Sequence, residues 1–437
     1  MQIATYIGFI LIGVLIAAAL LIFFLDVVRG APVESVGMPG DATSCPAIND
    51  PFFCESIELL THVDLRPGHE VEFFINGDET YPRLWEDLRS AKKSITMQLY
   101  YCNKGKMADT LLEILVERAR SGVEVFLLHD AFGTTLPNEY FEALEKAGVK
   151  VRPFRPFSFK SLQKMQHRAH IRVIVIDGTV GYTGGFGIDD KWYGTGRDKD
   201  QWRDTNVRFT GPAVRQLQAT FVVCWAEAST NLLTSDSLFP AEGHPGNGAE
   251  NKSDGVFAAV LHASPTIGST SAERFFVLSI AAAREKLYIS NSYFVPHKAF
   301  RQLLCDAAQR GVDVRVLTVS GLSDVKSTWY AGRARYEELF KGGVRIFEYQ
   351  PVMMHAKTIV VDGAWLTVGS MNADNRSISF NEESNLIVLD KDAGRRMEEI
   401  FLEDLRFAKE IEPGEFAKRG WKAKVAERAC HMIWRVL

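Results

Sequence analysis

The sequence predicts an α/β protein built from two copies of one unit and preceded by a single membrane-spanning helix. Three observations lead to this prediction. Strand-like and helix-like segments alternate along most of the chain, which is typical of a sheet with helices on its faces. Similar segments recur at offsets of 185 to 195 residues. A run of 20 apolar, uncharged residues stands near the start of the chain.

The composition is that of an ordinary globular protein. Of 437 residues, 46% are hydrophobic and 24% are charged, which excludes bulk disorder. At roughly 150 residues per domain, the length allows two or three domains. A polytopic membrane protein is excluded because only one apolar run is long enough to span a bilayer. The formal net charge of −4 argues against a generally basic surface for nucleic acid.

The apolar run extends from Tyr6 to Leu25 and contains no charged residue. About 20 residues are enough to cross the hydrocarbon core as a helix, so residues 1–29 are predicted to be a transmembrane anchor. A cleaved signal peptide is the alternative. It is disfavoured because no Lys or Arg precedes the run and no clear cleavage site follows it. The flanking Asp26 and Arg29 do not decide the orientation.

Residues 30–56 are rich in Gly, Pro, Ser and Asp and are predicted to be a tether. Cys45 and Cys54 lie in this segment, and they are candidates for a disulfide if it faces an oxidising compartment. Six cysteines in the whole chain are too few for a disulfide scaffold. No CxxC or HExxH motif indicates a zinc site.

The two copies are predicted to span residues 57–233 and 256–411. The linker between them, residues 234–255, is a run of Ser, Asp, Gly, Pro and Asn. Each copy runs through a strand, a helix and a second strand that begins with glycine. These three segments are 94–101, 110–121 and 122–128 in the first copy, and 286–294, 300–310 and 311–317 in the second.

A histidine motif follows in the second copy. His355 and Lys357 are two residues apart at the start of a strand, so their side chains project from the same face. Asp362 comes at the end of that strand. A lysine supplies positive charge for a phosphate, and an imidazole either attacks phosphorus or donates a proton. Ser370 and Asn372 are candidate hydrogen-bond donors to phosphate oxygens.

The first copy repeats this motif with His170, Arg172 and Asp177. In both copies a glycine follows 14 residues after the histidine, at Gly184 and Gly369. A single motif of this kind is as easily a surface strand with incidental polar residues. Because the polar positions recur together with the apolar ones, the paired motifs favour a functional site.

The two motifs resemble those of the phospholipase D superfamily, and most closely its bacterial cardiolipin synthase branch. The resemblance runs from about residue 57 to the C-terminus. An N-terminal membrane segment is also similar to that branch, although many members carry two spans. The stretches that carry the resemblance are Gly181-Tyr-Thr-Gly-Gly-Phe-Gly187, Trp202-Arg-Asp-Thr205, Tyr293-Phe-Val-Pro296, Tyr336-Glu-Glu-Leu-Phe340, 355–372 and Asn381-Glu-Glu383.

The resemblance implies two phospholipase D-like repeats packed as a pseudo-dimer, with the two histidines face to face. One histidine, expected to be His170, attacks the phosphodiester and becomes a covalent phosphohistidine. The other, His355, protonates the leaving alcohol and deprotonates the incoming one. Lys357 and Arg172 are expected to bind the phosphate oxygens, so that neither a metal nor a cofactor is required.

Further site residues follow from the same resemblance. Asp204 and Glu383 are expected to orient the histidines across the pseudo-twofold axis. Asp177 and Asp362 complete the catalytic motifs. The remaining residues expected to contact substrate are Gly185, Gly187, Ser370 and Asn372.

One position departs from the family pattern. Arg172 stands where the family has lysine, and the larger guanidinium fork is not equivalent at a tight site. A tolerated substitution is the favoured interpretation, and lower activity or a different substrate is the alternative. His167 does not restore a lysine motif, because Ala169 and Ile174 would then occupy its lysine and aspartate positions. His167 is expected at the rim of the site.

Two further segments are candidates for contact with lipid. The tail, residues 412–437, carries six Lys or Arg after Phe416 together with Trp421 and Trp434. This composition suits a basic amphipathic segment on anionic lipid, but a terminal helix packed on the domain is an equal alternative. The loop 189–201 is expected either to cover the site or to touch the bilayer.

The main hypothesis is a phosphatidyltransferase of the cell membrane, expected to be the bacterial inner membrane, that makes cardiolipin from two phosphatidylglycerol molecules. Its expected partners are phosphatidylglycerol, other anionic phospholipids and the bilayer. A hydrolase that yields phosphatidic acid uses the same chemistry with water as the acceptor. A non-catalytic membrane scaffold is supported only by Arg172. A nuclease is disfavoured by the net charge and the anchor.

Overall fold

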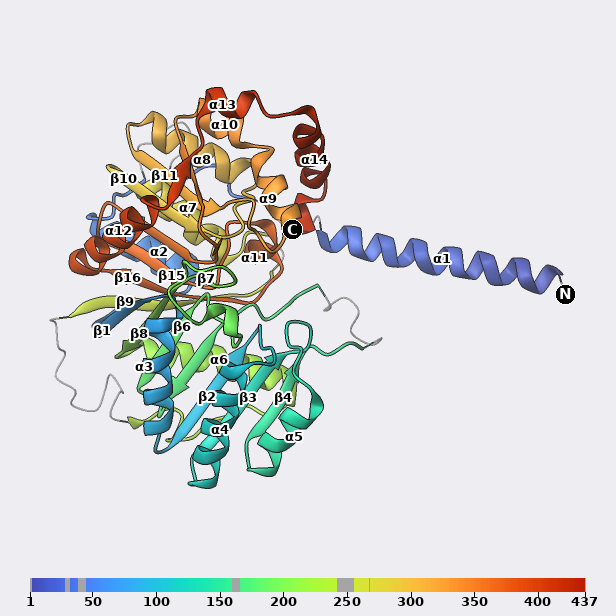
Figure 1. Ribbon diagram of the computed structural model, residues 1–437, viewed down its shortest axis with the longest axis vertical. Helices are drawn as coiled ribbons and strands as arrows, with labels where there is room; N and C mark the ends of the chain where they lie inside the picture. Colours follow the sequence, from blue (N-terminus) through green and yellow to red (C-terminus); the bar gives the residue numbers. More distant parts are fainter. Residues whose placement is uncertain are drawn as a thin grey trace.

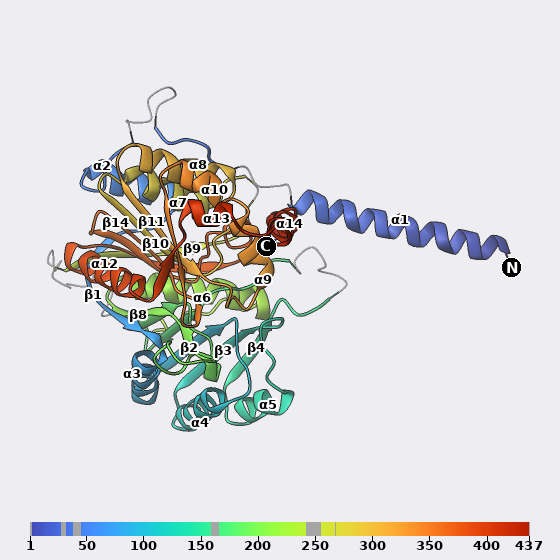
Figure 2. The same ribbon diagram turned by 45° about the horizontal axis from the view of Figure 1, so that its top comes forward.

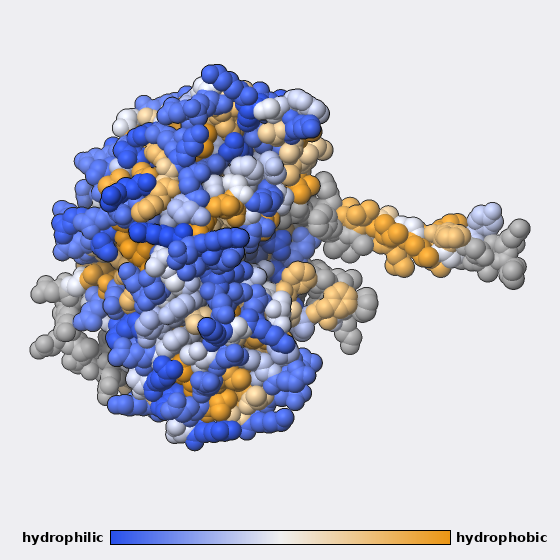
Figure 3. All heavy atoms as spheres, in the orientation of Figure 1, coloured by the Kyte–Doolittle hydropathy of each residue, from blue (hydrophilic) through white to orange (hydrophobic). Residues whose placement is uncertain are grey.

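The computed structural model describes residues 2–27, 32–37, 45–158, 166–241, 255–266 and 268–436. The helix α1 (Gln2–Val27) points away from a globular body that contains both repeats (Figure 1). Its described side chains are largely exposed and apolar, and they stand out against the mostly hydrophilic body in Figure 3.

No helix among the described residues combines the length and the hydropathy that crossing a membrane requires. The predicted transmembrane anchor is therefore not confirmed by the structure.

The first repeat contains one half of a continuous sheet. Its strands lie in the order β1-β8-β6-β5-β2-β3-β4. The strands β2, β3 and β4 are parallel, as expected where helices connect them, and the remaining pairs are antiparallel. The bounds are β1 Arg66–Ile75, β2 Ser94–Leu99, β3 Glu124–Asp130, β4 Lys150–Phe154, β5 Val173–Ile176, β6 Val180–Gly184 and β8 Thr205–Thr210.

The second repeat has the same strand order, β9-β16-β15-β14-β10-β11-β12, with β17 added at the outer edge. The two halves join where β1 pairs with β9 in an antiparallel register. The bounds are β9 Val256–Ala263, β10 Lys286–Asn291, β11 Asp313–Val319, β12 Arg345–Tyr349, β14 Lys357–Val361, β15 Trp365–Gly369, β16 Glu383–Leu389 and β17 Ala408–Glu410.

The helices form three apolar cores with the sheet. Two outer cores lie beneath α3, α4 and α5 in the first half and beneath α2, α7, α8 and α10 in the second. A central core includes α6, α12 and strands of both halves. The bounds are α2 Pro51–Thr61, α3 Asn76–Ser90, α4 Lys106–Arg120, α5 Asn138–Lys146, α6 Ala213–Ser229, α7 Ser271–Ala282, α8 Lys298–Gln309, α9 Lys326–Arg333, α10 Tyr336–Lys341, α11 Asn375–Ser379, α12 Lys391–Leu405, α13 Pro413–Ala417 and α14 Trp421–His431.

Burial explains why the central strands form where they do. Every residue of β2, β5 and β14 is buried, and their sequences are nearly continuous runs of apolar or β-branched residues. Such runs are typical of strands covered on both faces. The structure therefore matches the predicted α/β fold with two repeats.

One predicted boundary differs from the structure. Residue 57 was expected to begin the first repeat, but it lies inside α2, which packs on the second repeat. Phe53 and Ile57 of α2 are fully buried in the outer core of that repeat, and the Phe53 ring meets Trp365 edge-on at 5.0 Å. The apolar face of α2 needs a core to cover it, which the composition of the segment did not reveal. Cys45 and Cys54 are both free thiols, so they do not form the disulfide considered above.

Candidate active site

Short backbone pairings between the two repeats position the histidines. The segment before His355 is β13 (Met353–Met354), which pairs in parallel with β7 (Trp202–Arg203) of the first repeat. The His355 N–H then donates to the Arg203 carbonyl at 2.6 Å. In the other repeat, Ala169 forms an equivalent bridge with Glu382. Each histidine is thereby held beside the strand of the opposite repeat.

These crossings bring each imidazole to a carboxylate of the other repeat. His170 Nδ1 lies 3.0 Å from both carboxylate oxygens of Glu383. His355 Nδ1 lies 2.8 Å from Asp204 Oδ2. A carboxylate at Nδ1 favours the tautomer with a proton on Nδ1, which leaves the Nε2 lone pair for chemistry. The predicted pairing across the axis is thus present.

Both carboxylates are held by further donors. Asp204 accepts hydrogen bonds from the Trp192 indole N–H at 2.9 Å and the Thr205 N–H at 2.8 Å. Glu383 accepts from the Ser370 hydroxyl at 2.5 Å and the Asn381 amide at 3.2 Å. Such contacts restrict the carboxylate, and through it the orientation of the histidine.

The two cations occupy equivalent places beside the histidines. Lys357 Nζ donates to the His355 carbonyl at 2.6 Å and contacts His355 Nε2 and Ser292 Oγ, each at 2.9 Å. Arg172 Nη1 donates to the His170 carbonyl at 2.6 Å, and its Nε donates to the Phe186 carbonyl at 3.1 Å. Both side chains are 1% exposed. The site therefore concentrates two buried cations between two histidines.

Burial dominates the protonation of the site. It lowers the pKa of His170 and of His355 well below the usual range, and the nearby Lys357 and Arg172 lower both further. Burial also raises the pKa of Asp204 to about 6 and of Glu383 to about 8, against the hydrogen bonds and cations beside them. Burial lowers the pKa of Lys357 to about 7. Burial and the nearby cations thus favour neutral imidazoles, and the negative charge of a bound phosphate would favour their protonated form.

A family model described as "Cardiolipin synthase, PLD-like domain" matches residues 84–225 and 277–405 of this chain. The protein named cardiolipin synthase A in Pseudomonas syringae pv. syringae is 33% identical over 375 residues, covering 85% of this chain and 75% of the relative. The chain belongs to the cardiolipin synthase family. Membership in this family makes it an enzyme of the phosphatidyltransferase class, within the phospholipase D-like superfamily.

A second relative agrees with this placement in the family, and a solved structure shares the fold. The probable cardiolipin synthase of Bacillus subtilis (strain 168) is 30% identical over 392 residues, covering 88% of this chain and 76% of the relative. A crystal structure of phosphatidylserine synthase from Haemophilus influenzae Rd KW20 superposes with a TM-score of 0.69 at 13% identity, covering 88% of this chain and 100% of that one. At that identity the likeness shows the shared fold.

Asp177 and Asp362 of the family motif lie away from the histidines. They follow β5 and β14, at the strand ends opposite His170 and His355. Asp177 accepts the backbone N–H groups of Lys92, Lys93 and Ser94, at 2.7 to 3.1 Å. Asp362 does the same for residues 284–286, at 2.8 to 2.9 Å. Their expected catalytic role is corrected to a structural one, in which each ties a loop to its strand.

The expected substrate contacts separate into two kinds. A side chain at Gly185 would collide with the Asp204 carboxylate, and a Cβ at Gly187 would lie 2.8 Å from the Trp192 ring. These glycines therefore make room for the site rather than offer a group to substrate. Ser370 holds Glu383, whereas the buried Asn372 Oδ1 has no hydrogen-bond partner among the described residues.

His167 is not a rim residue. It is 8% exposed, and its Nδ1 lies 2.8 Å from the Phe380 carbonyl of the second repeat. Its ring also stacks on that of Phe380, with centroids 5.8 Å apart. His167 therefore contributes to the contact between the repeats.

Aromatic residues around the histidines were not predicted as part of the site. The Tyr100 ring meets the His170 ring edge-on, with centroids 5.0 Å apart, and the ring centroids of Trp202 and His355 are also 5.0 Å apart. The ring centroid of Trp192, near the start of the loop 189–201, lies 5.3 Å from that of His355, so this end of the loop borders the site. The only sequence signal was the clustering of Trp192 and Trp202 near the first histidine motif.

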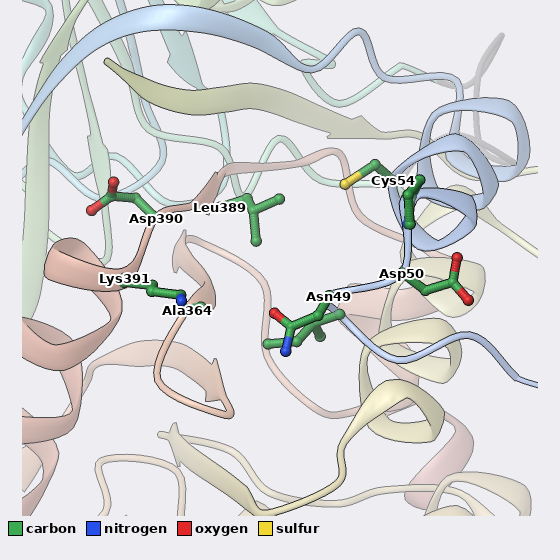
Figure 4. A pocket seen from close by; sticks show the side chains of 9 residues that line it. Asn49, Asp50, Cys54, Ala364, Leu389, Asp390 and Lys391 are labelled. Atoms are coloured by element: carbon green, nitrogen blue, oxygen red, sulfur yellow. The ribbon is translucent and has the colours of Figure 1, made fainter. Parts of the chain in front are cut away.

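One surface cavity lies apart from this site. It has a volume of about 370 Å³ and is lined by the start of α2 and by the turns that flank β15 and β16 (Figure 4). Asp50, Cys54, Leu389 and Lys391 are among its lining residues, and none of the site residues borders it.

Proposed function

We propose that the enzyme transfers a phosphatidyl group from one phosphatidylglycerol molecule to a hydroxyl of a second, which yields cardiolipin and glycerol. The observation that carries this proposal is the pair of crossed contacts, His170 with Glu383 and His355 with Asp204, around two buried cations. This arrangement suits a phosphodiester, which needs a nucleophile, a proton donor and positive charge within one site.

The first step forms a bond between His170 Nε2 and phosphorus. His170 is suited to attack because Glu383 holds its Nδ1 proton, which leaves the Nε2 lone pair for phosphorus. The phosphorus–oxygen bond to the glycerol head group breaks. The departing oxygen takes a proton from Nε2 of His355, which carries a proton on both ring nitrogens once the anionic phosphodiester is bound. Lys357 and Arg172 stabilise the charge on the remaining phosphate oxygens.

The second step reverses these roles. His355, now neutral, removes the proton from a hydroxyl of the second phosphatidylglycerol. That oxygen attacks phosphorus, the bond to His170 Nε2 breaks, and cardiolipin leaves. The free enzyme is restored with no net gain or loss of protons.

We also propose that α1 and α14 hold the enzyme at an anionic membrane. The run Tyr6–Leu25 has no charge, and the described side chains of α1 are largely exposed. The helix α14 exposes the apolar side chains Trp421 and Val425 beside Lys422 and Arg428, and Met432 is exposed directly after the helix. Figure 2 shows the C-terminal end of α1 beside α14, in agreement with Figure 1. A mixed apolar and basic face of this kind suits anionic lipid.

The test is mass spectrometry of lipids after the purified full-length chain is incubated with phosphatidylglycerol vesicles. We expect cardiolipin and glycerol from the wild type and neither from His170→Ala, with Lys199→Ala as an active control on an exposed loop. Phosphatidic acid without cardiolipin would show instead that water is the acceptor. Equal amounts of cardiolipin from the wild type and His170→Ala would contradict the proposed site.

A further inference from the structure

Three aromatic side chains beside His355 form a cage that holds a lysine ammonium. We define the aromatic cage as Tyr101, Trp192 and Trp202. Lys191 Nζ lies 3.8 Å from the ring centroid of Tyr101, 3.9 Å from that of Trp202 and 4.9 Å from that of Trp192. The ring centroids of Trp192 and Trp202 lie 5.3 and 5.0 Å, respectively, from that of His355. The cage therefore borders the histidine that handles the alcohol.

Ring faces are the contacts that hold this ammonium. Among the described residues, no carboxylate lies within ion-pair distance of Lys191 Nζ. The nearby Asp189 carboxylate instead accepts a hydrogen bond from the backbone N–H of Lys191. The negative faces of aromatic rings attract cations within about 6 Å. Trp192 is 2% exposed and fixed to Asp204 by its indole N–H. The cage is thus a rigid, preformed cation site that the protein fills with its own cation.

Within the part of the chain that the structure describes, such a cage lies beside His355 and not beside His170. Counted from the two histidines, Trp192 corresponds to Ser377. Counted from the equivalent carboxylates Asp204 and Glu383, Trp202 corresponds to Asn381. The otherwise similar halves therefore differ where they flank the reacting groups. A transferase needs such asymmetry, because one side of the phosphate carries the diacylglycerol and the other carries the head-group alcohol.

We propose that Lys191 is a specificity-determining residue that rejects cationic head groups at the alcohol side of the site. The inference rests on the proposed function, in which His355 protonates the leaving alcohol and deprotonates the incoming one. An ammonium already in the cage repels choline and ethanolamine and excludes them from the rings. It accepts a neutral glycerol head and attracts the phosphate that an acceptor phosphatidylglycerol carries.

The inference predicts what happens when the charge is removed. Lys191→Met keeps most of the aliphatic stem but leaves the ring faces without a cation. The emptied cage then resembles the aromatic sites that bind quaternary ammonium groups. Lys191→Arg keeps the charge and should keep the specificity.

The experiment supplies phosphatidylglycerol vesicles with equal concentrations of deuterated glycerol and choline, and measures labelled phosphatidylglycerol and phosphatidylcholine by mass spectrometry. For Lys191→Met we expect the ratio of choline to glycerol incorporation to rise by about tenfold over the wild type, as removal of one desolvated repulsion implies. Lys191→Arg and the exposed-loop control Lys199→Met should keep the wild-type ratio.

A second measurement does not depend on catalysis. Tetramethylammonium chloride is titrated into the full chain while tryptophan fluorescence is recorded. We expect a saturable change in Lys191→Met that the wild type lacks.

The outcomes separate this inference from the proposed function. If Lys191→Met is active, an unchanged ratio of choline to glycerol incorporation would overturn the inference alone. If Lys191→Met is inactive, the lack of a saturable fluorescence change with tetramethylammonium would overturn it. No glycerol incorporation by the wild type would overturn the proposed function, and with it the inference.

Discussion

At the scale of the residue, the site shows how an arginine replaces the family's lysine. Arg172 and Lys357 each donate to the backbone carbonyl of the histidine two residues before them. The second repeat places the small Ser292 against its lysine, whereas the first places the Tyr100 ring 5.7 Å from the guanidinium. The arginine is thus anchored to carbonyls and lies beside an aromatic ring. This environment supports the interpretation of Arg172 as a tolerated substitution.

The pKa of Asp204 predicts the acid limit of activity. Burial raises this pKa to about 6, so the carboxylate is ionised above that pH and holds His355, whereas below it the carboxyl is protonated and this hold weakens. We expect kcat/KM to rise with pH through about 6 as Asp204 ionises, and again through about 8 as Glu383 ionises beside His170. In Asp204→Asn the limb near 6 should vanish and kcat/KM should fall by about 10² to 10⁴, the usual contribution of an oriented acid–base group.

The measurement is the pH profile of kcat/KM for phosphatidylglycerol, with Asp198→Asn on the exposed loop as the control. An acid limb near pH 6 that persists unchanged in Asp204→Asn would assign that titration to another group.

At the scale of the element, two very short strands bring the catalytic groups together. β7 and β13 contain two residues each, and their pairing sets the separation of Asp204 from His355. β7 is fixed to α12 by a buried bidentate ion pair, in which Arg203 Nε and Nη2 lie 2.8 and 2.7 Å from the Asp404 carboxylate. This pair holds the segment that carries Asp204.

Removing one member of this ion pair should therefore destabilise the fold. Asp404→Ala leaves the Arg203 charge buried and unpaired, and we expect the free energy of unfolding to fall by about 3 to 5 kcal/mol. Glu403→Ala breaks the neighbouring exposed pair with Arg406 and should cost less than about 1 kcal/mol. The free energy of unfolding of both variants is measured by urea denaturation. Equal shifts of the urea midpoint in Asp404→Ala and Glu403→Ala would contradict the stabilising role of the buried pair.

Much of the element order could be predicted from the sequence, because β-branched runs and repeated glycines mark the strands of both copies. The paired histidine motifs could be found for the same reason. The pairing of β7 with β13 could not, since two residues show no periodicity. The structural role of Asp177 and Asp362 was also hidden, because spacing along a strand does not reveal which loop a carboxylate meets.

At the scale of the whole molecule, the C-terminal tail packs on the body beside the segment that leads out of β15. One face of α14 packs on the body, where Glu427 is buried and pairs with Arg419 at 2.8 Å. After α14, the Arg435 carbonyl accepts a hydrogen bond from the Asn375 amide at 2.5 Å. Asn375 begins α11, directly after the loop that follows β15. The helix is therefore packed on the domain on one face, as one alternative expected, and it presents apolar and basic side chains on the other.

The exposed face of α14 should matter only when the substrate is in a bilayer. Trp421→Ala combined with Val425→Ala removes apolar side chains that are 71% and 56% exposed. We expect transfer on phosphatidylglycerol vesicles to slow by about tenfold, as loss of roughly 1 to 2 kcal/mol of apolar contact implies. Rates on substrate in detergent micelles should not change. Leu402→Ala on α12 is the control, and an equal loss in both assays would contradict a membrane role.

The most direct test of the account is to trap the covalent intermediate. A phosphatidyl ester with a nitrophenol leaving group needs no proton to depart, so His355→Ala should still complete the first step but not the second. Peptide mass spectrometry after rapid quenching should then find a phosphatidyl group on His170. A phosphatidyl group on another residue, or no adduct in a variant that still releases nitrophenol, would contradict the assignment of His170 as the nucleophile.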